Sequence, residues 1–193
     1  MQHANRIEYC HLQSRRLIEA DLYPRFTLLG QAVGSFILGL EALFRMPPPL
    51  IWWDSMGYAF TYPAARFLAG CRVACYVHFP MISSDMLDAV AERRPSYNND
   101  ARVADSVTAS QLKLAYYRAF ALAYRLVGKC AEVVMCNSTW TKNHISALWG
   151  TPALLVYPPC LEKASPSISM QRQPLIVSIG QYKIVAGVRL CSR

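Results

Sequence analysis

The chain has 193 residues and a formal net charge of +8, with 53% hydrophobic and 17% charged residues. This length accommodates one ordinary domain and part of a second. The apolar content excludes a disordered chain, and only nine glycines exclude a collagen-like repeat. The positive charge favours polyanionic neighbours, which include nucleic acid, anionic lipid headgroups and phosphorylated substrates.

The cysteines give a first indication of the cellular compartment. There are seven, and no two have the CxxC spacing. An odd number without that spacing is not typical of a secreted disulfide scaffold. The segment from Met1 to Arg16 is polar and charged, so we expect no secretory signal there. We therefore expect a protein of a reducing compartment whose thiols are mostly small buried side chains.

The longest apolar stretch runs from Thr27 to Phe44 and has helical periodicity. We expect an amphipathic helix that packs on a sheet through its large apolar side chains. A membrane-spanning or interfacial helix is the alternative, although Glu41 would cost about 2.5–3.5 kcal/mol at the centre of a bilayer. The side chains of this predicted packing face are Leu29, Val33, Phe36, Ile37, Leu40 and Phe44.

After three prolines the chain alternates between short apolar strands and helices. The predicted strands are Leu50–Trp53, Arg72–Phe79, Glu132–Cys136 and Ala153–Tyr157. The predicted helices are Tyr58–Ala69, Asp85–Arg93, Thr108–Gly128 and Asn137–Trp149. Because the strands are continuous apolar runs joined by helices, we expect a Rossmann-like parallel α/β sheet with helices covering both faces.

The composition changes after Tyr157. Residues 158–174 are rich in proline, serine and glutamine, which predicts a linker. Residues 175–193 begin with an apolar run that predicts the first strand of a second α/β domain, most of which is missing. Residues 1–157 then form the first domain, and we expect its Rossmann-like fold to be incomplete.

The predicted helix Thr108–Gly128 carries a basic stripe. Arg118, Arg125 and Lys129 lie within about 40° of arc around the helix axis. A solvated face is the ordinary interpretation of such a stripe, and contact with an anionic membrane surface is the functional one. Nucleic acid is not favoured as a partner, because no cluster of arginine and lysine is interleaved with exposed aromatic residues.

Polar residues follow three of the predicted strands, where parallel sheets place their ligands. The first group is Asp54, Ser55 and Gly57, the second is His78, and the third is Asn137 with Ser138. A helix N-cap is the plain alternative for the third group, and a hydrogen-bonded core histidine for the second. A phosphate at the helix N-terminus and a crevice-lining acid or base are the functional alternatives.

Several familiar catalytic patterns do not occur. The spacing of Cys71, Cys75 and His78 is not a standard zinc pattern, so we expect no metal. The sequence also lacks a GxGxxG fingerprint, a P-loop and a GxSxG elbow, which argues against nicotinamide, ATP and serine-hydrolase chemistry.

Six segments carry a resemblance to a known family. Together they resemble the GDP-mannose-dependent α-1,2-mannosyltransferases that extend dolichol-pyrophosphate-linked oligosaccharides, within the retaining GT-B glycosyltransferases of family 4. The resemblance covers roughly residues 6–182 and keeps the family's order and spacing. The segments are Tyr23–Gln31, Asp54–Phe60, Cys75–Pro80, Ser84–Leu87, Val134–Thr141 and Val156–Cys160.

The resemblance implies two Rossmann-like domains that face a cleft, with the lipid-linked acceptor on the N-terminal domain and GDP-mannose on the C-terminal one. It implies attachment to the endoplasmic reticulum membrane with the active site on its cytosolic face, and other mannosyltransferases of the pathway as partners. Transfer retains the anomeric configuration and needs no metal cofactor. His78 matches a family histidine near the donor sugar, and Asp54, Ser55, Gly57, Asn137 and Ser138 are the expected substrate-binding residues.

The resemblance also shows where the chain departs from the family. Lys183 occupies the position of an arginine that holds the donor diphosphate, and the Pro-Glu-Lys that follows it in the family is absent. A lysine supplies charge there but not the bidentate fork of arginine. The donor domain and the glycine-rich first turn are missing as well. We therefore expect an acceptor domain truncated at both ends and inactive by itself, with a non-catalytic lipid-binding or partner-binding fragment as the alternative.

Overall fold

The computed structural model describes residues 7–93 and 106–159. The chain divides into two units, Met1–Tyr157 and Pro158–Arg193. Nearly all of the second unit lies outside the described residues, and with it Lys183, most of the predicted linker and the strand predicted after it. The following account concerns the first unit.

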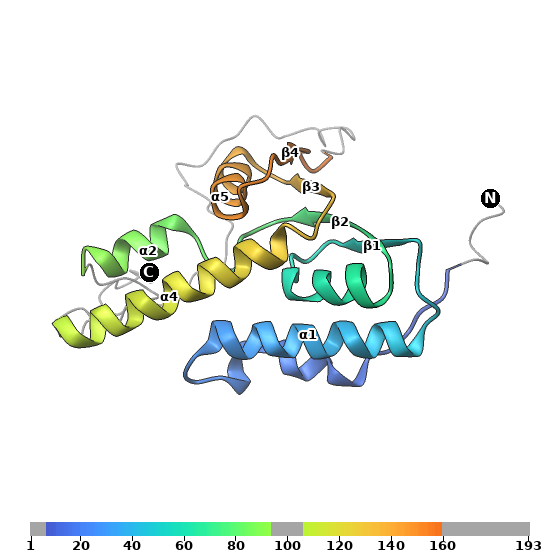
Figure 1. The fold of residues 1–193 in the computed structure, drawn as a ribbon, viewed down its shortest axis with the longest axis horizontal. Helices are drawn as coiled ribbons and strands as arrows, with labels where there is room; N and C mark the ends of the chain where they lie inside the picture. Colours follow the sequence, from blue (N-terminus) through green and yellow to red (C-terminus); the bar gives the residue numbers. More distant parts are fainter. Residues whose placement is uncertain (1–6, 94–105, 160–193) are drawn as a thin grey trace, which may run out of the picture. The chain divides into compact units, whose positions relative to one another are not determined.

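Four parallel strands form one sheet in the order β1-β2-β3-β4 (Figure 1). They are β1 (Ile51–Asp54), β2 (Arg72–Val77), β3 (Val133–Cys136) and β4 (Leu154–Leu155). All pairings are parallel, which confirms the predicted α/β class. Each strand lies where the sequence predicts one, and β4 is shorter than expected.

The helices between the strands are also largely as predicted. The segment after β1 is a short 3-10 turn, η4 (Ala59–Thr61), followed by a π-helical turn, η5 (Ala64–Leu68). The remaining helices agree with the predicted ones within a few residues at each end. They are α2 (Ser84–Ala91), α4 (Val107–Gly128) and α5 (Thr139–Trp149).

The prediction that helices cover both faces of the sheet is wrong for the described residues. Val73, Cys75 and Val77 point into the core, whereas the opposite face leaves Trp53 56% and Leu154 59% exposed. The strand order explains this. The sheet grows from β1 to β4 toward one edge only. Right-handed crossovers between such strands place every connecting helix on the same face of the sheet. The apolar runs indicate strands, but they do not show how many faces are covered.

An aromatic cluster forms the centre of the core. Tyr62, Tyr124 and Trp149 are fully buried, with the Tyr124 and Trp149 ring centroids 5.3 Å apart in an edge-to-face arrangement. Gly128 allows α4 to approach Trp149, because a Cβ atom at this position would fall against the indole ring. The cluster fixes α4 and α5 on the helical side of the sheet.

The fully buried residues of helix α1 (Thr27–Arg45) are all small, although Leu28 also packs against the core. Ala32, Ser35 and Gly39 are buried, and a Cβ atom on Gly39 would lie 2.9 Å from Thr61 Cγ2 of η4. The prediction that α1 packs through its large apolar face is therefore wrong. Its largest members point outward, since only small side chains allow this close approach.

Two short helices precede α1 and were not predicted. They are η2 (Gln13–Ile18) and η3 (Ala20–Leu22). Glu41 of α1 holds η2 in place by accepting the backbone N–H groups of Gln13 at 2.7 Å and Ser14 at 2.8 Å, together with the Ser14 hydroxyl. These bonds hold the pKa of Glu41 at about 2, well below its ordinary value. Among the described residues, α1 is a helix long and apolar enough to cross a membrane.

Candidate functional site

The carboxyl end of β1 is organised by the buried carboxylate of Asp54. Its Oδ1 accepts the backbone N–H groups of Met56 at 2.8 Å and Gly57 at 3.1 Å, and its Oδ2 accepts the Tyr62 hydroxyl at 2.6 Å. Gly57 has φ +83°, a left-handed conformation that favours glycine. Asp54 therefore builds the turn that leads into η4. Ser55 lies exposed on that turn.

Burial fixes the protonation state of the groups around Asp54. It raises the pKa of Tyr62 well above its ordinary range, with Cys75 and Asp54 adding to the effect. Tyr62 thus remains a proton donor to the carboxylate at physiological pH. Burial also raises the pKa of Cys75 to about 12 and that of Cys136 to about 11. These two thiols remain protonated and do not serve as nucleophiles.

His78 follows β2 and points away from the core. Its imidazole is exposed and lies edge-to-face against the Tyr76 ring, with the centroids 4.9 Å apart. Its backbone carbonyl accepts the hydroxyl of Thr141 at 3.1 Å, which ties it to the first turn of α5. Within residues 7–93 and 106–159, no hydrogen bond to the imidazole is found. The side chain is therefore exposed and is not a core histidine, and its functional role stays a prediction.

Asn137 and Ser138 follow β3 and differ in role. Ser138 is the N-cap of α5, and its Oγ accepts the backbone N–H of Thr141 at 3.2 Å. This is the plain alternative from the sequence. The backbone N–H of Asn137 reaches the Val77 carbonyl at 3.4 Å, whereas its buried Oδ1 has no hydrogen-bond partner among the described residues. This acceptor is therefore both buried and unsatisfied beside the end of β2.

The structure thus brings His78 and Asn137 together but separates Asp54 from them. Val77 pairs with Cys136 in the sheet, so His78 and Asn137 leave neighbouring strands at the same level. Asp54 pairs with Cys75, lower on the sheet, and its carboxylate faces the helical side. Substrate binding by Asp54, Ser55 and Gly57 stays a prediction.

An aromatic cluster beside His78 was missed by the sequence analysis. Phe79 stacks on Trp140 with ring centroids 5.0 Å apart, and Trp140 packs edge-to-face on His144 at 4.1 Å. The His144 ring is fixed in turn by a 2.8 Å hydrogen bond between its Nδ1 and Ser84 Oγ. The spacing of Trp140 and His144, four residues apart on a helix, is a signal that could have indicated their contact.

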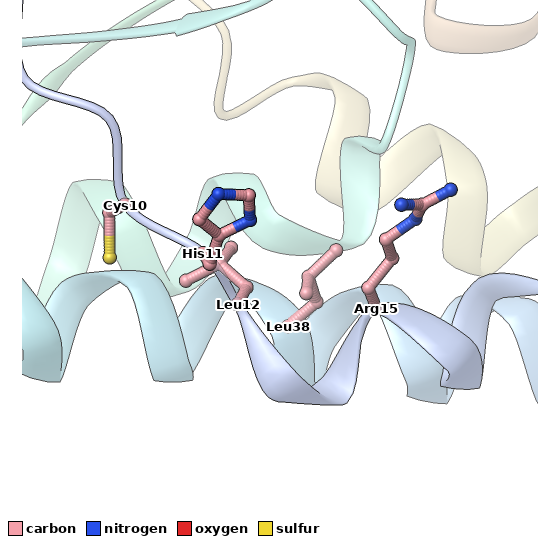
Figure 2. A pocket seen from close by; sticks show the side chains of 5 residues that line it. All are labelled: Cys10, His11, Leu12, Arg15 and Leu38. Atoms are coloured by element: carbon pink, nitrogen blue, oxygen red, sulfur yellow. The ribbon is translucent and has the colours of Figure 1, made fainter.

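A hollow of about 260 Å³ lies away from these strand ends. It is found between α1 and the segment that leads into η2. Figure 2 shows His11 and Arg15 pointing to the same side, with Leu38 between them; Cys10 and Leu12 complete the lining. No residue of the predicted site lines this hollow.

Comparison with known proteins identifies the family. The family described as "ALG11 mannosyltransferase N-terminus" matches residues 1–149, which is most of the chain. The chain belongs to the ALG11 mannosyltransferase family. No solved structure matches it.

Curated relatives of the ALG11 family are similar along nearly the whole chain. The mouse protein is 45% identical over 187 residues, which cover 93% of this chain and 38% of the mouse protein. The human protein is 45% identical over 184 residues and the Candida glabrata protein 38% identical over 188 residues. Each is named GDP-Man:Man(3)GlcNAc(2)-PP-Dol alpha-1,2-mannosyltransferase. The chain spans little more than a third of the length of these relatives.

Proposed function

We propose that this chain is the acceptor-side part of a mannosyltransferase that transfers α-1,2-linked mannose from GDP-mannose to a dolichol-pyrophosphate-linked oligosaccharide. The observation that carries the proposal is the similarity to relatives named for this reaction over more than nine-tenths of the chain. The parallel sheet with an accessible histidine at its carboxyl end is compatible with it. The place of action is the cytosolic face of the endoplasmic reticulum membrane, and the complete fold is GT-B.

His78 is the proposed catalytic residue of this chain. Its exposed imidazole follows a strand held by parallel pairing on both sides, and its carbonyl is fixed by Thr141. A histidine placed in this way can hydrogen-bond a sugar hydroxyl and orient the donor for transfer. Asn137, which follows the neighbouring strand at the same level, is the proposed second residue that contacts the sugar. We propose that the reaction proceeds with retention and without a metal cofactor.

Neutralisation of the GDP leaving group requires positive charge at the donor diphosphate. Lys183 is the residue that we predict for this role. It lies outside the described residues, so its role stays a prediction. The lysine side chain supplies one positive charge but cannot form two parallel hydrogen bonds to the diphosphate.

A non-catalytic fragment that binds a lipid or a partner is the second candidate. In this case the chain binds the lipid-linked acceptor or a partner without transferring sugar. In both cases we expect no turnover by the purified chain. Robust transfer by the purified chain to a lipid-linked trimannosyl acceptor would contradict the truncated-enzyme interpretation.

A chimera separates the two candidates. Residues 1–157 of this chain replace the matching part of the mouse relative, and mannose transfer from GDP-mannose to the lipid-linked acceptor is measured. The catalytic proposal expects an active chimera whose turnover falls sharply on His78→Ala, whereas His11→Ala, away from the strand ends, leaves it unchanged. A folded chimera in which His78→Ala alters only acceptor affinity or stability would support the non-catalytic candidate.

A further inference from the structure

The Phe79 side chain presents an aromatic surface just after the carboxyl end of β2. It is 63% exposed, although Trp140 covers one face of its ring, with the two ring planes 23° from parallel and the centroids 5.0 Å apart. The exposed area therefore belongs mainly to the other face and the outer edge of the Phe79 ring. A ring that is already held in place loses little entropy when a ligand packs on it.

The support behind the Phe79 ring extends through α5 to α2. The Trp140 ring packs on His144, one helical turn further along α5, with centroids 4.1 Å apart. Ser84 Oγ lies 2.8 Å from His144 Nδ1, and Asp85 Oδ2 lies 3.6 Å from His144 Nε2, both at the start of α2. These contacts tie the ring stack to two helices, so the outer face of Phe79 is preorganised for binding.

Two exposed hydroxyl groups belong to the same end of the sheet. Thr139 directly precedes Trp140 in α5, and its Oγ1 lies 3.2 Å from the hydroxyl of Tyr157, which follows β4. Both side chains are exposed, Tyr157 by 64%. The ring stack and the hydroxyl pair consist of neutral side chains. An aromatic face bordered by neutral hydroxyls favours a ligand that has both an apolar face and hydroxyl groups, in preference to an anion or a purely apolar chain.

A hexopyranose sugar has this combination of groups. Several of its C–H bonds project from one face and carry a partial positive charge, whereas the face of an aromatic ring is negative, so the two attract each other when they stack. The hydroxyl groups of the sugar stand around its rim, where protein hydroxyls can donate to them and accept from them. The relatives are named for an acceptor written Man(3)GlcNAc(2)-PP-Dol, whose saccharide part consists of such rings.

We propose that the outer face of Phe79 stacks on a mannose ring of the lipid-linked acceptor, and that the hydroxyl pair of Thr139 and Tyr157 binds hydroxyl groups of the same oligosaccharide. We call this surface the stacking platform. The proposal rests on the proposed function, which makes this chain the acceptor side of the enzyme. Phe79 directly follows His78, so an acceptor bound here adjoins the proposed catalytic residue. Trp140 does not contact the sugar and is a positioning residue that holds the Phe79 ring.

Saturation-transfer NMR of the full chain tests the stacking platform. The ligand is soluble Man(3)GlcNAc(2), the acceptor saccharide without pyrophosphate and lipid. Aromatic protons of the protein are saturated, and transfer to the C–H protons of each sugar ring is measured during a titration. We expect transfer to one face of a mannose ring. Phe79→Ala should raise the Kd about tenfold, whereas Phe79→Tyr keeps an aromatic face and should remain within about twofold of wild type.

The matched control is Phe67→Ala. Phe67 is 71% exposed on η5, which precedes the amino end of β2, so its removal should leave both the transfer pattern and the Kd unchanged. Trp140→Leu removes the support but not the platform. We expect it to raise the Kd about threefold while transfer to the same sugar face persists. Circular dichroism verifies that each variant retains its helices.

The chimera with the mouse relative separates this proposal from the proposed function. Phe79→Ala should raise the KM for the lipid-linked acceptor about tenfold and leave the KM for GDP-mannose unchanged, and Trp140→Leu should act in the same direction but less strongly. An active chimera whose acceptor KM does not respond to Phe79→Ala would refute the stacking platform alone. An inactive chimera, together with sugar binding by the full chain that depends on Phe79, would count against the proposed function alone.

Three results with the full chain would overturn the proposal. The first is the absence of saturation transfer to Man(3)GlcNAc(2) at millimolar concentration. The second is equal binding by Phe79→Ala and Phe67→Ala, which would place the sugar elsewhere on the chain. The third is transfer to GDP-mannose, and not to the oligosaccharide, that disappears in Phe79→Ala, because this would assign the stacking platform to the donor.

Discussion

The hydrogen bond between Tyr62 and Asp54 offers a sharp test of how the end of β1 is held. The Tyr62 hydroxyl is fully buried and donates to Asp54 Oδ2 at 2.6 Å. Tyr62→Phe keeps the ring in the core and removes only this donor. Hydrogen bonds to charged groups contribute about 1.5–3 kcal/mol to stability. We therefore expect Tyr62→Phe to lower the free energy of unfolding by about 1.5–3 kcal/mol.

The matched control is Tyr76→Phe. The Tyr76 hydroxyl donates to the Val156 carbonyl at 2.8 Å. The Tyr76→Phe variant therefore also loses one hydrogen bond, but this bond is exposed and its acceptor is neutral. We expect a cost of about 0.5–1 kcal/mol or less. The comparison therefore isolates burial and the charge of the acceptor, because the chemical change is the same in both variants.

Urea denaturation at neutral pH, followed by circular dichroism, measures both free energies, and a thermal melt verifies them. For a chain of this size, the Tyr62→Phe loss corresponds to a Tm decrease of about 3–12 °C. Equal losses in Tyr62→Phe and Tyr76→Phe, or a Tyr62→Phe loss below about 0.5 kcal/mol, would refute the argument that Asp54 depends on Tyr62.

Three further predictions concern α1, the core and α5. Glu41→Gln should lower the Tm at neutral pH, since the pKa of Glu41 is about 2 in the folded chain against 4.5 ordinarily. A carboxylate with a depressed pKa stabilises the folded chain above its ordinary pKa, so the Tm difference between wild type and variant should close as the pH falls from 4.5 toward 2. A Tm difference that stays constant with pH would contradict this. Gly128→Ala should cost about 1–3 kcal/mol in urea denaturation, because its Cβ would meet the Trp149 ring, and an unchanged free energy of unfolding would contradict this. Ser138→Ala should cost about 1 kcal/mol through loss of the α5 N-cap, and an unchanged stability would show that Thr141 is satisfied in another way.

The order and type of the elements could be predicted from the sequence because local signals agree there. The strand β2 is a continuous apolar run ended by Pro80, and α5 has Ser138 at its start and Gly150, with φ +66°, at its end. These signals depend on neighbouring residues alone. The number of covered sheet faces depends on which strands add to which side, and no local pattern in the chain records this.

The orientation of α1 could not be predicted from its periodicity. Hydrophobicity identified the face with Val33 and Ile37, and that face is exposed. The buried face is defined by the small side chains of Ala32, Ser35 and Gly39, which let η4 approach closely. Apolar periodicity favours large side chains as packing residues. For a helix that packs through small side chains and exposes large ones, apolar periodicity therefore predicts the wrong face as buried.

At the candidate site, the position of His78 follows from its place after an apolar strand, but the role of Asp54 does not. The turn from Asp54 to Gly57 is visible in the sequence. The second carboxylate oxygen of Asp54 accepts the Tyr62 hydroxyl, and that contact requires the segment after β1 to fold back toward Asp54. The stack of Phe79 on Trp140 joins residues from two strand ends, so it also appears only in the folded chain.

The outer edge of β1 gives a last prediction. Strand β1 is an edge of the sheet, and within the described part of the chain no hydrogen bond reaches its outer side. Ile51 is 54% and Trp53 56% exposed, so the edge is both unpaired and apolar. Edges of this kind promote association between chains. We expect the purified chain to associate with rising concentration and to unfold over a broad temperature range.

Light scattering and size-exclusion chromatography measure this association. Trp53→Lys places a charge on the edge strand and should shift the chain toward the monomer. Phe67→Lys makes the same kind of change at an exposed site of η5, away from the edge, and should leave association unchanged. A wild-type monomer with a sharp cooperative melt at high concentration would show instead that the edge of β1 is protected, and the argument from its unpaired backbone groups would fail.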